Sequence, residues 1–481
     1  MTPSSEQQDI HDEFDLVVIG SGPAGQRAAV QAAKLGKKIG LVERMPSLGG
    51  VCILTGTVPS KTFREAVIDI EGAGAFHPGK KNPSKPAMSA VLQRVSEVLL
   101  SESEVVRRQL ARNGVELIRG TGRFKDAHTL EARSLATVRQ VRSKRFLIAV
   151  GTRPAAPQDV PVDGRIILTS DEILALEKLP DSMVVVGGGV IGIEYASFFA
   201  RLGVAVTLID RHGKPISFID AQIVDELMAQ MEAEGVTFLM NDGVATINVH
   251  HKPDPHAELT LNSGRKINCD KVLYSIGRIA ATETLDLDRV GVEYDERGRL
   301  SVDEDYRTNV PHIYAAGDVI GFPALAATSS EQGRIATCRM FGIQAAKMGT
   351  HYPYGIYSIP EISMVGKTEE ELRAEGTQFV TGVARYSEIA RGQILGDETG
   401  LFKMLFHEET KELLGVHCIG TGATELVHVG QAALKLGGGL SYFLETVFNY
   451  PTLAECYKVA AFDAANKIGY LPESERFEKE R

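Results

Sequence analysis

Short apolar runs, each closed by a glycine-rich turn, recur along this chain of 481 residues. The run at 14–19 leads into the turn Gly-Ser-Gly-Pro-Ala-Gly at 20–25, and the run at 183–186 leads into Gly-Gly-Gly-Val-Ile-Gly at 187–192. A short β-branched run predicts a buried strand, and the apolar or alanine-rich stretch after each turn predicts a helix. The pattern therefore predicts the same strand, turn and helix unit twice.

An acidic residue stands at the same place in both units. Glu43 ends the apolar run 39–42 and Asp210 ends the run 204–209, and each acid follows the first glycine of its turn by 23 residues (20 to 43, and 187 to 210). In dinucleotide-binding folds the glycines let the backbone approach a pyrophosphate at a helix N-terminus, and the acid binds ribose hydroxyls. Two complete units predict two bound dinucleotides.

The rest of the chain supplies further strands, helices and crossings between domains. Residues 71–90 are rich in Gly, Pro and Lys, which predicts a surface loop, and 90–112 has apolar positions at helical spacing. Strands are predicted at 145–151 and 271–276, and the crossings at Thr152-Arg153-Pro154 and Gly277-Arg278. Strands at 402–406 and 413–418, followed by helices, indicate a last α+β domain. The predicted fold class is α/β, with two Rossmann-like dinucleotide-binding domains plus a C-terminal α+β dimerisation domain.

Composition and charge narrow the possible partners. With 43% hydrophobic and 24% charged residues the chain is typical of a globular protein. Its formal net charge of -10 disfavours nucleic acid and anionic membranes as partners, and no apolar run reaches the ~18 residues of a membrane span. Five scattered cysteines without a CxxC pair favour a reducing cytoplasm. His250, His251 and His256 lie among Lys, Asp and Pro, so we expect a solvated loop there and no metal site.

Two more segments carry a family resemblance. Residues 49–61 read Gly-Gly-Val-Cys-Ile-Leu-Thr-Gly-Thr-Val-Pro-Ser-Lys, and 315–318 read Ala-Ala-Gly-Asp. With the two glycine-rich turns and the two crossings, these segments make residues 14–468 resemble the flavoprotein disulfide reductase superfamily. The resemblance implies that the first unit binds FAD, the second binds NAD or NADP as substrates, and the last domain forms a homodimer or higher oligomer. The domains expected are 1–152 and 281–350 for FAD, 153–280 for NAD(P), and 351–481 for the interface.

The resemblance also implies site residues, which we name by their positions in this chain. Those expected at FAD are Gly20, Gly22, Gly25, Glu43, Arg44, Gly49, Gly50, Cys52, Lys61, Gly122, Ala149, Gly151, Gly317, Asp318, Leu325 and Ala326. Those expected at NAD(P) are Gly187, Gly189, Gly192, Glu194, Asp210, Arg211 and Gly277.

Two positions depart from the disulfide reductases. That family has a second cysteine where this chain has Thr57, and a catalytic histidine where it has Tyr450, although the glutamate that follows is kept as Glu455. A dithiol/disulfide couple needs two sulfurs, and a phenol, whose ordinary pKa is ~10, shuttles protons poorly near neutral pH. We therefore expect no redox-active disulfide. Cys52 is interpreted as a buried packing residue of the loop, with a peroxidatic or sulfenate-forming thiol as the alternative.

Loss of the sulfur chemistry with intact cofactor motifs is typical of one branch of the superfamily, the transhydrogenases. The chain resembles that branch in its Gly-Thr-Val-Pro-Ser-Lys and Phe-Asn-Tyr-Pro-Thr segments. The resemblance implies reversible, Si-specific hydride transfer from NADPH to NAD+ through flavin N5 in a ping-pong cycle. Lys61 is expected beside N5 with Glu194 as its ion-pair partner, both in catalytic roles. An FAD-dependent NAD(P)H reductase of quinones or oxygen is the first alternative, and a non-catalytic flavin-binding subunit is the second.

An enzyme of this kind must accept two nucleotides that differ by one phosphate. Asp210 suits the free 2′-hydroxyl of NAD, whereas Arg211, helped by His212 or Lys214, suits the 2′-phosphate of NADP. The mixture of one acid and nearby cations is consistent with use of both nucleotides.

Overall fold

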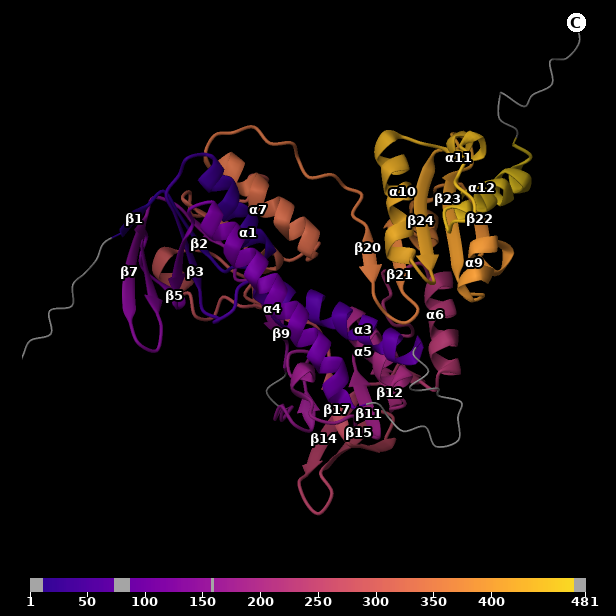
Figure 1. Ribbon diagram of the computed structural model, residues 1–481, viewed down its shortest axis with the longest axis horizontal. Coiled ribbons are helices and arrows are strands. Elements are labelled where there is room, and N and C mark those ends of the chain that lie inside the picture. Colours follow the sequence, from indigo (N-terminus) through magenta and orange to yellow (C-terminus); the bar gives the residue numbers. More distant parts are fainter. Residues whose placement is uncertain (1–11, 73–86, 157–159, 471–481) are drawn as a thin grey trace, which may run out of the picture.

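The computed structural model describes residues 12–72, 87–156 and 160–470. Figure 1 shows a first unit around β2 and β3, a second around β11 and β12, and a third that carries β21 to β24 and the last helices. The long helix α4 (Met88–Arg112) reaches from the first unit towards the second.

The first unit is built on a five-stranded parallel sheet with the order β19-β8-β2-β3-β4. Its strands are β2 (Leu16–Ile19), β3 (Ile39–Glu43), β4 (Glu116–Arg119), β8 (Phe146–Ile148) and β19 (Ile313–Ala315). Helices α1 (Pro23–Lys34) and α7 (Ala326–Met340) pack on one face. The other face meets the sheet β1 (Asp12–Phe14), β7 (Val138–Ser143), β6 (Thr129–Arg133) and β5 (Thr121–Asp126). The central strands β2 and β8 and the strand β19 are buried throughout and continuously apolar, as expected for parallel strands covered on both faces.

Two strand predictions in this unit were wrong at their ends. The run 14–19 is not one strand, because β1 ends at Phe14 and pairs with β7, while β2 begins at Leu16. Asp15 separates them and accepts hydrogen bonds from the Lys38 backbone N–H and from Lys144 Nζ, each at 3.0 Å. The strand predicted at 145–151 stops at Ile148, since the chain turns at Gly151, where φ is 65°.

The second unit repeats the parallel design. Its sheet has the order β10-β17-β11-β12-β13, with parallel pairing throughout. The strands are β10 (Ile167–Leu168), β11 (Ser182–Val186), β12 (Ala205–Asp210), β13 (Thr237–Met240) and β17 (Lys271–Tyr274). Helix α5 (Val190–Arg201) follows the second glycine-rich turn, and α6 (Ala221–Ala233) follows β12.

A small antiparallel sheet extends this unit through β14 (Val244–His250), β15 (His256–Leu261) and β16 (Lys266–Cys269). The loop predicted around the three histidines is shorter than expected. His250 and His256 are paired strand residues whose rings stack at 4.6 Å, and the loop is confined to the residues between them.

The two predicted crossings lie side by side. Strand β9 (Thr152–Pro154) pairs antiparallel with β18 (Arg278–Ala280). Arg278 donates from Nε to Thr152 Oγ1 at 2.8 Å and from its guanidinium to the Thr152 carbonyl at 2.9 Å. The chain therefore leaves the first unit and returns to it through one hydrogen-bonded ribbon.

The third unit has an antiparallel sheet with the order β20-β21-β24-β23-β22. Its strands are β20 (Tyr354–Ile356), β21 (Ile362–Gly366), β22 (Phe379–Arg385), β23 (Leu401–His407) and β24 (Leu413–Ile419), so the strands predicted at 402–406 and 413–418 are confirmed. Its helices are α8 (Glu369–Glu375), α9 (Ala390–Leu395), α10 (Ala423–Leu436), α11 (Leu440–Glu445) and α12 (Glu455–Ile468).

Helix α3 (Thr57–Gly72) joins the first two units. Phe63 on this helix packs against Tyr195, Phe198 and Phe199 of α5, with ring centroids 5.8–6.1 Å apart. The loop predicted at 71–90 loses its ends to α3 and α4, and residues 73–86 lie outside the described residues, as does the C-terminal tail from 471. Across the described ranges, no helix combines the length and apolar character needed to cross a membrane.

Candidate active site

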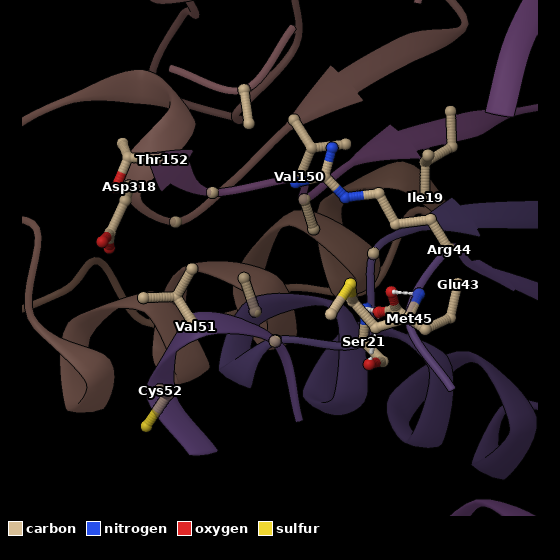
Figure 2. Close-up of a pocket in the computed structure, with 18 of the residues that line it drawn as sticks. Ile19, Ser21, Glu43, Arg44, Met45, Val51, Cys52, Val150, Thr152 and Asp318 are labelled. Carbon is tan, nitrogen blue, oxygen red and sulfur yellow. Dashed lines mark hydrogen bonds between the residues drawn. The ribbon is translucent and has the colours of Figure 1, made fainter. Parts of the chain in front are cut away.

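An elongated cavity lies at the carboxyl ends of the first parallel sheet. It holds roughly 1260 Å³ of atom-free space, counting its open mouth. Figure 2 shows Glu43, Arg44 and Met45 at one end and Cys52 and Asp318 at the other. Its walls come from segments far apart in the chain, at 19–24, 42–57, 120–122, 149–152, 281–285 and 316–329.

The first glycine-rich turn forms the floor of this cavity and tolerates no side chain at two positions. Gly20 has a φ of 103°, and a Cβ there would lie 2.4 Å from the Ala149 carbonyl oxygen. A Cβ on Gly25 would lie 1.9 Å from the Gly20 carbonyl oxygen. The turn therefore brings the start of α1 against the cavity, where no side chain caps the helix. Uncapped N–H groups at a helix N-terminus suit a phosphate.

Glu43 ties this turn to the end of β3. Its Oε2 accepts hydrogen bonds from the Ser21 backbone N–H at 2.9 Å and the Ser21 hydroxyl at 2.6 Å, and its Oε1 accepts one from the Met45 N–H at 2.8 Å. The side chain is buried, and it lines the cavity beside the exposed Arg44. The Glu43 carboxylate therefore holds the turn in place through these hydrogen bonds, and one lone pair of Oε1 remains for a ligand hydroxyl.

The segment 49–61 was predicted as a loop, and this was wrong. It forms α2 (Gly50–Leu54) and the start of α3, because Pro59 falls in the first turn of α3, where proline is tolerated. The glycines instead serve packing, since a Cβ on Gly50 would lie 2.9 Å from Gly22 Cα and one on Gly49 would lie 2.5 Å from the Ile53 side chain.

Cys52 is partly exposed on the cavity wall, which corrects its prediction as a buried residue. Burial raises the pKa of its thiol above the ordinary 9.0, and a hydrogen bond with Thr57 opposes this only in part. The thiol therefore stays protonated near neutral pH. Thr57, which also lines the cavity, contributes a hydroxyl where a disulfide would need a second sulfur.

Asp318 closes the far end of the cavity. It begins a 3-10 turn after Gly317, whose N–H donates to Gln332 Oε1 at 2.8 Å, and it accepts a hydrogen bond from the Ser329 hydroxyl at 3.1 Å. Burial raises the pKa of Asp318, while Ser329 and the charge of Arg278 act in the opposite direction. Apart from the Ser329 hydroxyl and its own backbone N–H, Asp318 accepts from no other donor among the described residues, so the carboxylate can still accept a hydrogen bond from a ligand hydroxyl.

Most residues predicted at FAD lie on this cavity. Those in its lining are Gly20, Gly22, Glu43, Arg44, Gly50, Cys52, Gly122, Ala149, Gly151, Gly317, Asp318 and Ala326. The other four, Gly25, Gly49, Lys61 and Leu325, lie outside the lining. The two glycines pack closely against Gly20 and Ile53, and Leu325 is the N-cap of α7. Lys61 lies one helical turn beyond Thr57.

Lys61 and Glu194 form an ion pair between the first two units. Lys61 Nζ lies 2.7 Å from Glu194 Oε1 and 2.8 Å from Oε2, and it also donates to the Ser60 hydroxyl at 3.1 Å. The Glu194 side chain is only 3% exposed, whereas Lys61 is 24% exposed. The buried carboxylate fixes the position of the Lys61 ammonium, which is still partly open to solvent. A cation held in this way can stabilise negative charge on a ligand beside it.

The second glycine-rich turn has the same backbone geometry as the first. Gly187 has a φ of 108°, and a Cβ there would lie 2.6 Å from the Ser275 carbonyl oxygen, while a Cβ on Gly192 would lie 1.9 Å from the Gly187 oxygen. Gly189 caps α5 without a side-chain hydrogen bond, which again leaves N–H groups for an anion. Gly277 also has a positive φ, at the crossing beside β18.

Asp210 is bound to its own neighbours at the end of β12. Its Oδ2 accepts a hydrogen bond from the Gly188 N–H, and its Oδ1 accepts from the His212 N–H at 2.8 Å and lies 2.7 Å from His212 Nδ1. Burial raises the pKa of Asp210, but the hydrogen bonds from His212 and Gly188 outweigh it, and the pKa lies below its ordinary value.

The cations beside Asp210 differ in whether they already have an ion-pair partner. Lys214 forms an ion pair with Asp225. Arg211 is exposed, and within the described ranges its guanidinium has no hydrogen bond or ion pair. Arg211 is therefore the cation in this cluster that can bind a phosphate without first giving up a partner.

Several residues at the site were missed by the sequence reasoning. Ser21, Asp171 and Ser329 line the cavity, and Tyr357 contacts the Lys61–Glu194 pair from the third unit. Ser21 stands between the first two glycines of the turn, so its place in the motif was a signal in the sequence. Asp171 and Tyr357 lie far from any motif and meet the site only through the fold. Tyr450 and Glu455, on the third unit, do not line this cavity.

Comparison with protein families places both parts of the chain. The family model for pyridine nucleotide-disulphide oxidoreductases matches residues 14–333, and the dimerisation domain of the same family matches residues 352–461. A soluble pyridine nucleotide transhydrogenase of Mycobacterium bovis is 48% identical over 471 residues, covering 96% of this chain and 100% of that protein. One from Marinobacter nauticus is 42% identical and covers 95% of this chain and 99% of the relative.

Solved structures agree in fold. LpdA from Mycobacterium tuberculosis superposes with a TM-score of 0.84 at 27% identity, over 93% of this chain and 99% of that one. The HOCl-induced flavoprotein disulfide reductase RclA from Escherichia coli has a TM-score of 0.85 at 24% identity, over 93% of this chain and 99% of that one. By its family matches and its full-length relatives, this chain belongs to the pyridine nucleotide-disulphide oxidoreductases and, within them, to the soluble pyridine nucleotide transhydrogenases.

Proposed function

We propose that this protein transfers hydride reversibly between NADPH and NAD+, with FAD as its resident cofactor and without a redox-active disulfide. The observation that carries the proposal is the Lys61–Glu194 ion pair between two dinucleotide units, next to a cavity where Cys52 faces Thr57 and no second thiol. Membership of the transhydrogenase family supports the same reading.

The residues of the first cavity fit FAD. The uncapped start of α1 suits the pyrophosphate, the end with Glu43 and Arg44 suits the adenosine half, and Asp318 suits a hydroxyl of the ribityl chain. On this assignment residues 1–152 and 281–350 form the FAD domain, 153–280 the NAD(P) domain, and 351–481 the interface domain.

When bound, the flavin supplies the redox chemistry by accepting hydride from one nicotinamide and returning it to the next. The protein supplies position and charge. Lys61 Nζ carries a positive charge that Glu194 and Ser60 hold in place, and such a charge stabilises negative charge that builds up beside it. Because Cys52 stays protonated and has no partner thiol, no residue in the described part of the chain offers a route onward to a sulfur substrate.

The second turn must release one nucleotide before it takes the other. We propose that Asp210 accepts a hydrogen bond from the 2′-hydroxyl of NAD and that Arg211 binds the 2′-phosphate of NADP. The exposure of Arg211 and the partial exposure of Asp210 support a site that exchanges its ligand.

We also infer a homodimer formed through the third unit. This unit matches the dimerisation domain of the family. It exposes large apolar side chains, among them Leu436 (85%), Val447 (91%) and Tyr450 (69%), and a second copy would cover such a surface. A cytoplasmic location fits the use of both nucleotides and the unpaired cysteines.

The test mixes purified protein with NADPH and the thionicotinamide analogue of NAD+, whose reduced form absorbs at a distinct wavelength. Rapid appearance of the reduced analogue supports the proposal. NADPH oxidation that occurs only when a quinone or oxygen is present would identify a reductase instead, and no oxidation at all would identify a non-catalytic flavoprotein. NADPH deuterated at C4 tests Si-face transfer: the NADP+ produced should have lost the deuterium of the pro-S isomer and kept that of the pro-R isomer, and the reverse result would indicate the other face.

A further inference from the structure

Three units meet at the Lys61–Glu194 ion pair, and the third contributes a residue that no motif marks. Tyr357 follows β20 directly, and its backbone N–H donates to Glu194 Oε1 at 2.9 Å. Its ring lies under Lys61, with Nζ 4.9 Å from the ring centroid. Tyr357 thus contacts both members of the pair at once.

The two residues after Tyr357 bind the helices that carry the ion pair. Arg64 Nε of α3 donates to the Ser358 carbonyl at 3.1 Å, and the Ile359 N–H donates to the Ser197 hydroxyl of α5 at 3.1 Å. Ser358 and Ile359 are buried. Three consecutive residues of the third unit therefore bind α3, which carries Lys61, and α5, which carries Glu194.

We propose that Tyr357 is a positioning residue for hydride transfer, holding the Lys61 ammonium against Glu194 through its ring face and its backbone N–H. The inference rests on the proposed function, in which Lys61 acts at the flavin. It makes the third unit part of the active site within one chain, in addition to its role as an interface.

The chemistry of the contacts explains how this works. A cation within ~6 Å of an aromatic ring centroid is attracted to the ring face, most strongly where water is partly excluded. Tyr357 is partly buried, its phenol is hydrogen-bonded to Thr424 on α10, and burial raises its pKa, so the ring stays neutral and fixed near neutral pH. Its N–H takes one lone pair of Glu194 Oε1 and so restricts the orientation of the carboxylate that faces Lys61.

The ring and the phenol can be separated by substitution. Tyr357→Leu keeps the backbone N–H and removes the ring face, whereas Tyr357→Phe keeps both and removes only the hydroxyl. Tyr354→Leu is a matched control, because Tyr354 lies three residues earlier on β20, is also partly buried, and packs on Phe218, 5.8 Å away between ring centroids.

The experiment measures two quantities on each holoenzyme. The first is the rate of reductive methylation of Lys61 by formaldehyde and cyanoborohydride, followed by peptide mass spectrometry, which does not depend on turnover. The second is kcat and KM for NADPH with the thionicotinamide analogue. We expect Tyr357→Leu to raise the methylation rate of Lys61 and to lower kcat, each by about threefold to tenfold. KM for NADPH should change less than kcat, because Tyr357 contacts α5 at Glu194, beyond the second glycine-rich turn at 187–192.

Rescue by Tyr357→Phe, with wild-type values for Tyr354→Leu, supports the inference. An unchanged kcat in Tyr357→Leu overturns it, and so does an equal fall in kcat for Tyr354→Leu, which would indicate general loosening of β20. If the wild-type protein transferred no hydride, the proposed function would be wrong. The methylation rate of Lys61 would still show, independently of turnover, whether Tyr357 holds the ammonium in place.

Discussion

The two glycine-rich turns have nearly the same backbone conformation, but the acid beside the first is buried and the acid beside the second is partly exposed. Gly20 and Gly187 have φ values of 103° and 108°, and a Cβ on either would meet a carbonyl oxygen at 2.4 or 2.6 Å. Around the first turn, Glu43 is 5% exposed and holds the turn against β3, and the cavity has walls from segments far apart in the chain. Around the second, Asp210 stands beside exposed Arg211 and His212.

This difference shows how one motif serves two kinds of ligand. A cavity walled by segments from distant parts of the chain surrounds its ligand on several sides, so it suits a cofactor that stays bound. A turn at the surface with unpaired charge beside it suits a substrate that must leave in every cycle. The motif supplies the phosphate site in both, and the surroundings set the residence time of the ligand.

The largest effect should come from alanine at the first glycine of each turn. Gly20→Ala would place a Cβ 2.4 Å from the Ala149 oxygen, and we expect the protein to purify with little flavin and to lose transhydrogenase activity. Gly187→Ala is the matched variant, with the same strain at the second turn, and it should retain flavin while losing activity. The ratio of flavin to protein absorbance distinguishes them; equal flavin loss in both variants would contradict the comparison.

The ion pair between the units comes next. Lys61→Met removes the charge and leaves the flavin cavity intact, because Lys61 is not part of its lining. We expect kcat to fall about 100-fold, as when other preorganised charge-stabilising groups are removed, with flavin content unchanged. Steady-state kinetics and the flavin spectrum check this. A fall of less than twofold would mean that the pair only joins the two units.

A smaller effect should separate the two nucleotides. Arg211→Ala should raise KM for NADPH about tenfold, the loss of one charge-assisted contact, and leave KM for NADH within twofold. Lys214→Ala is a suitable comparison, because Lys214 already has Asp225 as its partner and should shift KM for NADPH less. Equal rises for both nucleotides in Arg211→Ala would remove Arg211 from the phosphate site.

The smallest effect on turnover should come from the contact that holds the second unit to the third. Asp220, the N-cap of α6, accepts from Lys403 Nζ at 2.8 and 3.0 Å, and both side chains are buried. Burial raises the pKa of Asp220, but His417 and Lys403 outweigh it, so the pKa lies below its ordinary 3.8. Because the pKa of Asp220 is lower in the folded state, the ionised carboxylate stabilises the folded protein. This contribution is complete above the unfolded-state pKa, ~3.9, and is lost as the pH falls through the folded-state pKa.

Lys403→Met should therefore move acid unfolding to higher pH by roughly one unit, because without the ammonium burial raises the pKa of Asp220. Circular dichroism against pH measures the midpoint. Lys347→Met is the control, since Lys347 pairs with Glu304 at the surface, where the side chains are 76% and 82% exposed. The same shift in both variants would show that net charge, and not the buried contact, sets the acid limit.

The features that could be predicted from the sequence are those that depend on residues close together in the chain. Both turns, both acids and the order of the units follow from glycine spacing and apolar runs, and the family resemblance supplied the pairing of Lys61 with Glu194. The segment 49–61 was predicted as a loop from its likeness to the family's active-site segment, whereas Gly50 lets α2 pack against the first turn. Tyr357 and Asp171 could not be found, since each reaches the site only when distant segments meet, and no spacing along the chain encodes such a contact.

The hydroxyl of Thr57 beside the Cys52 thiol has a consequence for inhibition. Trivalent arsenicals poison dithiol enzymes by chelation, bridging two neighbouring sulfurs. Here the reagent would find a single anchor at the cavity, because the other four cysteines are buried elsewhere. A cell exposed to such a poison should keep this route between its two nicotinamide pools open while dithiol flavoenzymes are blocked, and loss of turnover at low arsenical concentration would show otherwise.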